Sequence, residues 1–546
     1  MIALIPAGVI LAMALAWWLM HRARAASERV LKEAFGRISD KKHDMSRVVS
    51  YHVHSSQANE EASYLDSTTW GDLSMDAVYQ RINTCHCSVG DEYLYHILHD
   101  VDTPESTLVF RSRLREWLSS DEASRLRLQR ILVGIGKQPG NELGAYVFDP
   151  VAKRLSHDWV YGVLAMLPLV ACAILPVSIQ IGMVLLLCIV CLNIMVSVTK
   201  ASVLESDLAG LRYFSSLVYG AKKIHRVLGV RLNEIGTEGT FGDDFAMSLV
   251  PYRHMSSVLP GSMNRFAAEM EVPFLVFKAV FLMDLVLYNR TVDLMISHNL
   301  ELKLLYESIG ELDVAVSSAS FCASIPWYCS PHFEEKNSIR IEGGYHPLIS
   351  DPVSNTVVLE NDCIVTGSNA SGKSTFIKMI AVNHILAQSL FICCAKTYSL
   401  GRAYVISSMA VRDDIESGES YFMAEIRSLR RIMDECKTQR CVCFIDEILR
   451  GTNTPERIAA STAVLRVLHE TESRCLVASH DIELTRILDE VYENYHFSEH
   501  FQGNEVVFDY LLKEGPSKTR NAIRLLEYMG FDEQVVAEAR TMLGEK

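Results

Sequence analysis

The chain contains 546 residues, too many for one ordinary domain, and its length suggests about three or four structural units. Its formal net charge of −14 excludes wholesale attraction to nucleic acid, because phosphate binding depends on Lys and Arg, and leaves only a local basic patch open. The 14 cysteines are scattered without the spacing of a zinc site, so we interpret them as reduced, mostly buried thiols in a cytosolic environment.

The first apolar segment covers residues 2–20 and contains no charged residue. His21, Arg22 and Arg24 follow it directly. A helix of about 19 residues is just long enough to cross the hydrocarbon core of a bilayer. We therefore expect an N-terminal transmembrane anchor over residues 1–24. The alternative is a cleaved signal peptide, although such a peptide normally carries its basic residues before the apolar run.

Residues 25–156 mix charged and apolar residues at helical spacing, and the same pattern returns in residues 201–335. We interpret these two stretches as the parts of one helical domain. Between them, residues 159–199 contain no charged residue, which is too long for one membrane crossing and suits two. The sequence therefore predicts a transmembrane helical hairpin over residues 157–200, with its turn at 176–180.

Basic residues flank this hairpin, namely Lys153, Arg154 and Lys200, whereas its turn has no Lys or Arg. The positive-inside rule then places both flanks in the cytoplasm and the N-terminus outside. We expect a multi-pass protein of the cell (plasma) membrane whose C-terminal domain lies on the cytoplasmic face. The alternative is the buried core hairpin of a soluble protein, but Trp159 and Tyr161 at its border are typical of interfacial anchors.

From residue 336 the sequence pattern changes to short β-rich runs, followed by alternating helices and apolar strands. This alternation is typical of a parallel α/β sheet. The predicted fold is therefore multidomain. Transmembrane helices and an all-α domain come first, and an α/β domain with C-terminal helices occupies residues 336–546.

A phosphate-binding loop opens this α/β domain, after an apolar strand at 363–365 and before a helix expected to begin near Thr375. The motif G-x-x-x-x-G-K-[ST] is matched by Gly367, Ser368, Asn369, Ala370, Ser371, Gly372, Lys373 and Ser374. Its backbone N–H groups and the helix N-terminus would hold the phosphates of ATP. Lys373 would reach the β- and γ-phosphates, and Ser374 would ligate Mg²⁺. The sequence thus predicts a P-loop ATPase.

A second apolar run, residues 441–447, ends in Asp446 and Glu447. A strand needs such a run when both its faces are buried, so the two acids mark the point where it emerges. Alone, this pattern would be an ordinary strand end. Beside a P-loop, it predicts that Asp446 holds Mg²⁺ through water and that Glu447 is the catalytic base for the attacking water.

Two further elements are interpreted together with the P-loop and the two acids. The strand at 475–479 leads to His480, which we expect to sense the γ-phosphate, although a lone His at a strand end is ordinarily a surface residue. Residues 414–422 contain Ser-Gly-x-Ser before a helix, which presents the Ser420 hydroxyl and free N–H groups to an anion. In isolation it would be an ordinary N-cap.

These four elements, in this order, resemble the ATPase domain (domain V) of the MutS family of DNA mismatch-repair proteins. Residues 365–375 look like the family's TGPNMGGKST, residues 414–425 its DDLASGRSTFMVE, residues 446–452 its DEIGRGT, and residues 478–485 its ATHYFELT. The resemblance implies that Thr375 and Gln388 belong to the nucleotide site. It also implies a homodimer through the ATPase domains, in which Ser420 of one subunit contacts the γ-phosphate bound by the other.

Resemblance extends upstream in shorter pieces. Residues 70–94 look like the start of the MutS core domain, residues 310–315 resemble its GELDALA stretch, and residues 345–348 resemble the strand before its P-loop. The helical region would then be a MutS core and lever domain. We find no Phe-x-Glu wedge in a glycine-rich N-terminal context, so we expect a membrane-anchored MutS-like subgroup that lacks the mismatch-recognition domain.

Three functions follow as hypotheses. The first is a membrane-anchored ATPase that hydrolyses ATP with Mg²⁺ at composite dimer sites and moves helical levers, acting on DNA or on an unknown protein partner. The second is a membrane-tethered sensor of mismatched DNA or DNA structure in repair, which should show a basic stripe within residues 201–330. The third is a transporter-like ATPase, which the near absence of intramembrane polar residues beyond Asn193 disfavours.

Overall fold

The chain divides into two compact units, and each is described by itself. A helical unit comprises Met1–Glu61, Ile82–His96 and Val109–Ser324, and an α/β unit comprises Ala62–Arg81, Ile97–Leu108 and Ile325–Lys546. The computed structural model describes residues 18, 21–22, 25–38, 44–59, 62–137, 143–148, 154–235, 240–253, 276–368, 371–409, 421–502, 505–517 and 529–542. The expected N-terminal anchor over residues 1–24 lies almost wholly outside these ranges.

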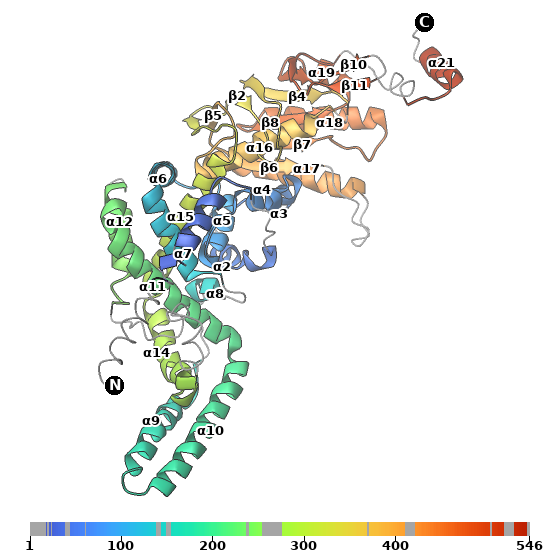
Figure 1. Cartoon of the computed structure of the whole chain (residues 1–546). Coiled ribbons are helices and arrows are strands. Elements are labelled where there is room, and N and C mark those ends of the chain that lie inside the picture. Colours follow the sequence, from blue (N-terminus) through green and yellow to red (C-terminus); the bar gives the residue numbers. More distant parts are fainter. Residues whose placement is uncertain are drawn as a thin grey trace. The chain divides into compact units, whose positions relative to one another are not determined.

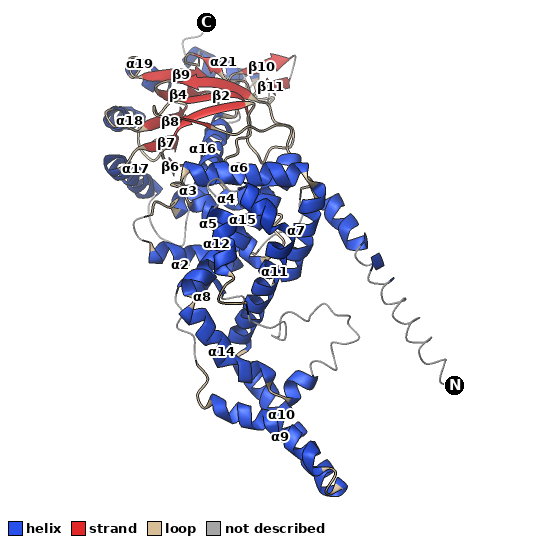
Figure 2. Ribbon diagram, turned by 90° about the vertical axis from the view of Figure 1, so that its left-hand side faces the viewer, coloured by secondary structure: helices blue, strands red, loops and turns tan. Residues whose placement is uncertain are grey.

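The helical unit is built around α15 (Asn299–Ala323), whose second half is almost wholly buried, because its apolar and small residues pack on all sides and its two acids, Glu311 and Asp313, have hydrogen-bond partners in the interior. Long amphipathic helices surround it and bury one stripe each. Figure 2 shows this unit as entirely helical in its described part. Its remaining elements are η1 (Met45–Arg47), α2 (Ser50–Ala58), α5 (Ser88–His99), α6 (Glu105–Ser120), α7 (Glu122–Ile135), α8 (Leu143–Phe148), α9 (Asp158–Ile174), α10 (Ile179–Val203), α11 (Glu205–Ile235), α12 (Thr240–Ser248) and α14 (Met283–Ser297).

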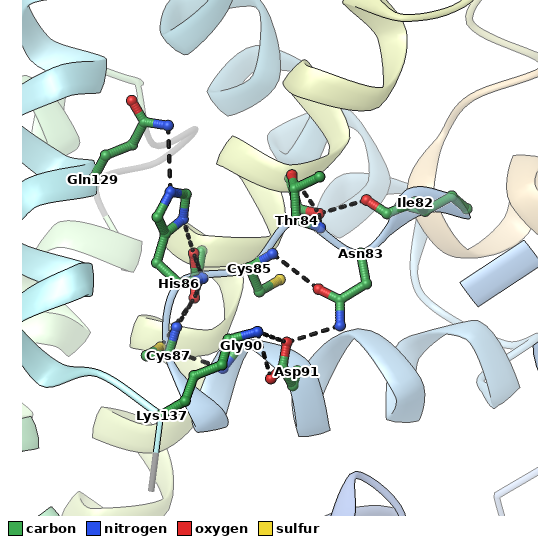
Figure 3. Close-up of polar contacts among 12 residues, drawn as sticks. Ile82, Asn83, Thr84, Cys85, His86, Cys87, Gly90, Asp91, Gln129 and Lys137 are labelled. Carbon is green, nitrogen blue, oxygen red and sulfur yellow. Dashed lines mark hydrogen bonds and ion pairs between the residues drawn. The ribbon is translucent and has the colours of Figure 1, made fainter. Parts of the chain in front are cut away.

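A buried carboxylate fixes the loop before α5 to α15. Asp313 is fully buried and accepts hydrogen bonds from the backbone N–H groups of His86 (2.8 Å) and Cys87 (2.9 Å). Burial alone would raise the pKa of Asp313, but its hydrogen bonds with His86 and Cys87 outweigh burial and lower the pKa. Figure 3 shows the same loop held from its other side, with Lys137 reaching Asp91. Two separate stretches that resemble the MutS core, 70–94 and 310–315, therefore meet in space.

The predicted hairpin is present as two apolar helices, α9 and α10, which run side by side (Figure 1). The described residues include one helix long and apolar enough to cross a membrane, Ile179–Lys200, and only 17% of its most apolar window is buried. Pro168 lies inside α9 and has no N–H for the carbonyl of Leu164. The Asn193 amide of α10 donates to that carbonyl (2.9 Å) and also to the carbonyl of Val280 (2.7 Å).

The α/β unit contains a six-stranded sheet in the order β12-β9-β4-β8-β7-β6, in which only the edge strand β12 is antiparallel. A second sheet has the order β1-β5-β2-β3, and β10 and β11 form a hairpin. The strands are β1 (His332–Glu334), β2 (Ile339–Gly344), β3 (Asn355–Leu359), β4 (Asp362–Thr366), β5 (Thr397–Gly401), β6 (Tyr404–Ser408), β7 (Cys441–Asp446), β8 (Arg474–Ser479), β9 (Tyr492–His496), β10 (Glu499–Gln502), β11 (Glu505–Phe508) and β12 (Lys513–Glu514).

Helices cover both faces of the larger sheet. The helix α16 (Lys373–Leu390) packs on β6, β7 and β8 and also contacts the smaller sheet through Tyr398, so it is buried almost all round. The opposite face is covered by α17 (Tyr421–Thr438), α18 (Thr454–His469) and α19 (Ile482–Ile487), which share one apolar cluster with the strands (Figure 2). A short helix, α21 (Glu533–Met542), follows the sheet in the chain. This doubly covered parallel sheet is the α/β fold that the sequence predicts.

An early segment of the chain belongs to this unit. The helical pattern of residues 25–156 did not predict this membership. The helix α3 (Ser67–Asp72), followed in the chain by α4 (Met75–Ile82), lies along the edge strand β6. Thr69 Oγ1 accepts a hydrogen bond from the Ser407 N–H, and Asp72 Oδ2 accepts from the Met409 N–H, both at 3.0 Å. An edge strand presents unpaired N–H groups, and these side chains satisfy two of them. The unit also begins earlier than residue 336, because β1 pairs with β5.

Candidate nucleotide site

The phosphate-binding loop leaves the fully buried strand β4 and enters α16. Gly367 and Gly372 have φ angles of +141° and +103°, where side chains are rarely tolerated. A Cβ atom on Gly367 would lie 2.7 Å from the Phe497 carbonyl oxygen, so this position also has no room for one. The helix begins at Lys373, two residues before the expected start, because Gly372 in the left-handed region ends the loop there. Asn369 and Ala370 lie outside the described residues.

Lys373 points back over the loop. Its ammonium donates to the carbonyl oxygens of Gly367 (2.6 Å) and Ser368 (2.8 Å), and the residue is only 2% exposed. Burial lowers the pKa of Lys373, while the charges of Glu447 and Asp446 act in the opposite direction. The two acids and the lysine therefore share one electrostatic environment, as the sequence predicts. Ser371 closes the loop by donating to the Ser368 carbonyl (2.7 Å).

The sheet register explains how the acids come to face the loop. The strands β4, β8 and β7 are neighbours and parallel, with Thr366 opposite Ser479 and Asp446 opposite Ala478. All three strands thus end at the same edge of the sheet. Strands lie about 5 Å apart, so β4 and β7 are separated by only about 10 Å at that edge.

Asp446 offers an oxygen that no described protein group uses. The residue is 7% exposed, and its Oδ1 atom is buried without a hydrogen-bond partner among the described residues. Buried polar atoms without a partner are rare and call for an ion or water. Ser374 stands half-buried on the first turn of α16, across the same edge. Among the described residues, no group of three or more His, Cys, Asp or Glu side chains is placed so that it could hold a metal ion.

Glu447 occupies a strained position directly after β7. Its φ angle is +59°, and its N–H donates to the Ala478 carbonyl at 2.9 Å. The side chain is nearly buried and pairs with the Arg450 guanidinium and with His480 Nδ1, the latter at 3.4 Å. Burial alone would raise the pKa of Glu447, but His480, Arg450 and Lys373 together lower it. The acid is therefore kept ionised, as a base that accepts a proton must be.

His480, which the sequence analysis assigns to sensing the γ-phosphate, follows β8 and lies beside Glu447, with its side chain half exposed. Its hydrogen bond with Glu447 raises the pKa of His480 against the effect of burial. The next residue, Asp481, holds Arg457 of α18 in a two-point ion pair at 2.6 and 2.8 Å. This pair anchors the segment that carries His480, so the imidazole is presented from a fixed position.

Other expected site residues are placed differently. Gln388 is fully buried near the end of α16, and its amide makes two 3.0 Å hydrogen bonds with the backbone of Ala403. Fifteen residues of helix separate Gln388 from Lys373, or about 22 Å. The structure therefore does not bring Gln388 to the phosphate loop, and its amide is already used. Thr375 is exposed on the first turn of α16. Ser420 lies outside the described residues, but α17 begins immediately after it, at Tyr421.

Two residues of the site were given no role by the sequence. Arg450 contacts Glu447 directly, and the Glu425 carboxylate accepts from the Arg450 N–H at 3.2 Å. Both lie inside stretches that resemble MutS motifs, which was the only signal that could have singled them out. Leu449 stands where the quoted family motif has glycine, and it adopts a φ angle of +57°, a conformation that favours glycine.

Comparison with known proteins agrees with this geometry. Residues 363–545 match the family model described as MutS domain V. The chain is 32% identical over 248 residues to the DNA mismatch repair protein MutS of Natronomonas pharaonis, covering 43% of this chain and 29% of that protein. It is 30% identical over 274 residues to that of Methanosarcina mazei, covering 47% and 30%. For Shouchella clausii MutS the identity is 28% over 257 residues, covering 45% and 29%. The chain thus spans less than a third of the length of these relatives.

Proposed function

We propose that the protein is a membrane-anchored ATPase whose nucleotide cycle moves the helical unit, because residues 363–545 match the model of MutS domain V, an ATPase domain. The observation that carries the proposal is the meeting of Lys373, Asp446 and Glu447 at one edge of the sheet. A loop of backbone N–H groups beside a lysine binds a triphosphate, and two acids facing it make hydrolysis feasible.

Each residue has a defined task in this reaction. The N–H groups of the loop and the N-terminus of α16 bind the phosphates, and Lys373 exchanges its loop carbonyls for phosphate oxygens. Ser374 and the free Oδ1 of Asp446 would hold Mg²⁺, which supplies charge neutralisation when bound. Glu447 orients the attacking water and accepts its proton, and His480 keeps that carboxylate ionised.

The proposed site is composite. MutS ATPase domains typically pair, and the resemblance places Ser420 of one subunit at the γ-phosphate bound by the other. The start of α17 at Tyr421 puts Ser420 directly before a helix, the place from which an anion is bound by N–H groups. Turnover of the purified full-length chain tests this. Ser420→Arg and Lys373→Ala should each be inactive, and mixing the two should restore part of the activity. Failure of the mixture to recover would contradict the shared site.

A bilayer is the partner we propose for the hairpin. Its side chains are mostly exposed and apolar, and only 17% of the most apolar window of α10 is buried, whereas the core helix of a soluble protein is mostly buried. The hydrogen bonds from Asn193 support the same proposal, because a carbonyl group without its helical N–H partner cannot bond to water inside a membrane and needs a side-chain donor. The α/β unit would face the cytoplasm. Retention in the membrane pellet after an alkaline wash tests this, and complete release would contradict it.

The relatives are named DNA mismatch repair proteins, which makes DNA the first partner to test. ATPase rates with and without homoduplex, mismatched and branched DNA distinguish a DNA-driven motor or membrane-tethered repair sensor from one acting on a protein. Equal rates in all cases would exclude DNA stimulation. A transporter-like role is disfavoured, because Asn193 uses its amide nitrogen for two backbone carbonyls, which leaves only its Oδ1 atom without a partner among the described residues.

A further inference from the structure

The segment before α14 has an exposure pattern opposite to that of a surface in water. Val276 and Phe277 are each 49% exposed, and we call them the exposed pair. The side chain of Lys278, the next residue, is only 12% exposed, and its Nζ atom lies 3.9 Å from Asp284 Oδ1. In water, lysine is almost always on the surface and large apolar side chains favour the interior. Apolar side chains that point outward and a cation that points inward suit surroundings that are themselves apolar.

A hydrogen bond fixes the level of this segment relative to the hairpin. The Asn193 amide of α10 donates to the Val280 carbonyl at 2.7 Å. Asn193 precedes Lys200, the last residue of the apolar span Ile179–Lys200, by seven positions (200 − 193). At helical rise it therefore lies about 10 Å inside that end of the span. Val280 lies at the same level, and so within the span rather than beyond its end.

Charged side chains mark the point where the chain leaves this level. Asp284 follows Val280 by one helical turn and pairs with Arg212 of α11 at 3.0 Å. Further along α14, the Asn289 amide donates at 3.1 Å to Asp158, the residue at which α9 begins. The chain thus passes from the interior of the span at Val280 to the charged end of the hairpin at Asn289.

Apolar packing holds the segment against the hairpin. Leu282 and Leu285 are buried in one cluster with Tyr161 of α9, and Leu164 and Val196 pack against this cluster from α9 and α10. Figure 1 shows the corresponding contact between α14 and α9. One side of the segment is therefore covered by the hairpin, while the exposed pair lies on a side that the hairpin leaves open.

We propose that residues 276–283 form a third membrane-embedded segment, which lies beside the hairpin and presents the exposed pair to lipid acyl chains. The proposal rests on the proposed function, because the segment takes its level from a hairpin that spans the bilayer. Lys278 is tolerated there because Asp284 lies nearby and because a lysine stem can extend toward the headgroups. Two helices of the helical unit, α11 and α14, then both extend from the membrane.

Site-specific photo-crosslinking to lipid tests this segment. Benzoylphenylalanine, which keeps an aromatic ring, is placed at position 277 of the full-length protein in vesicles of phosphatidylcholine with tagged acyl chains. The first control is position 187 on α10, where Leu187 is 67% exposed within the span. The second is position 230 near the end of α11, where Val230 is 77% exposed outside it. We expect phospholipid adducts at positions 277 and 187 and none at position 230.

The outcomes separate the segment from the hairpin. Adducts at position 187 without adducts at position 277 would overturn the third segment and leave the membrane-spanning hairpin in place. Absence of adducts at both positions would overturn the insertion of the hairpin itself, and the segment with it. Equal labelling at positions 230 and 277 would also overturn the proposal, because exposure alone would then explain it. If the variant at position 277 does not fold, position 276, which is equally exposed, takes its place.

Discussion

Asn193 supplies the hydrogen-bond donor that Pro168 removes from its own helix. The carbonyl of Leu164 would normally accept from the residue four positions later, but that residue is proline. The Asn193 amide takes its place at 2.9 Å and binds Val280 as well, so one side chain joins α9, α10 and the segment before α14. In a bilayer this donor would be difficult to replace, because no water competes for the carbonyl.

We expect Asn193→Leu to destabilise the hairpin by about 0.5–1.5 kcal/mol, the order of magnitude of hydrogen bonds between helices in a membrane protein. Pro168→Ala restores an N–H to the Leu164 carbonyl, so Asn193→Leu should cost less in the Pro168→Ala background. Denaturant unfolding in detergent micelles measures both differences. An equal cost in the two backgrounds would show that Asn193 does not compensate for the proline.

Glu447→Gln should abolish turnover while leaving ATP binding intact. Removal of a general base typically costs about 10²-fold to 10⁴-fold, whereas the phosphate-binding loop is untouched. Single-turnover hydrolysis and binding of a fluorescent ATP analogue measure the two effects separately. Full hydrolysis in Glu447→Gln would remove this residue as the catalytic base.

The pH profile should reveal what His480 does to Glu447. The pKa of Glu447 is lowered, so its stabilising contribution is present above its ordinary pKa and is lost as pH falls through the folded value. The pKa of His480 is raised, so its contribution is complete below its ordinary pKa and is lost as pH rises through the folded value. Their mutual stabilisation is therefore largest between the two ordinary pKa values. His480→Ala should move the acidic limb of kcat/KM to higher pH, and an unmoved limb would contradict the pairing.

The contact of α3 with β6 yields a matched pair of substitutions. Burial raises the pKa of Asp72, and one of its oxygens accepts from both Ser407 Oγ (2.7 Å) and the Met409 N–H. An amide oxygen can do the same, so Asp72→Asn should be nearly neutral. Asp72→Leu leaves both donors without a partner and should cost about 1–3 kcal/mol. Thermal unfolding compares the two, and equal losses would show that the carboxylate charge itself is needed.

The sequence was sufficient for the phosphate loop and the two acids. Residues 367–374 form one contiguous motif between a strand and a helix, and Asp446 and Glu447 end a strand whose burial shows in its composition. A parallel sheet brings the carboxyl ends of its strands to a common edge, so these local signals were enough to predict that the loop and the acids lie together. Lys373 and both acids do share that edge.

Contacts between distant segments could not be foreseen in the same way. Glu425 and Arg450 have no partner that spacing alone reveals, and the association of α3 with β6 joins residues 338 positions apart. Gln388 shows the opposite case, where a resemblance suggested a nucleotide contact and the fold uses the amide for Ala403.

The amino-acid sequence by itself thus determined the kind of chemistry and the two apolar helices of the hairpin, because both depend on neighbours along the chain. Only the tertiary structure decided which side chain forms a hydrogen bond with each buried polar group. The same few types of hydrogen-bond donor and acceptor occur throughout the chain, so the sequence does not reveal their pairs. The fold decides which donor lies next to which acceptor.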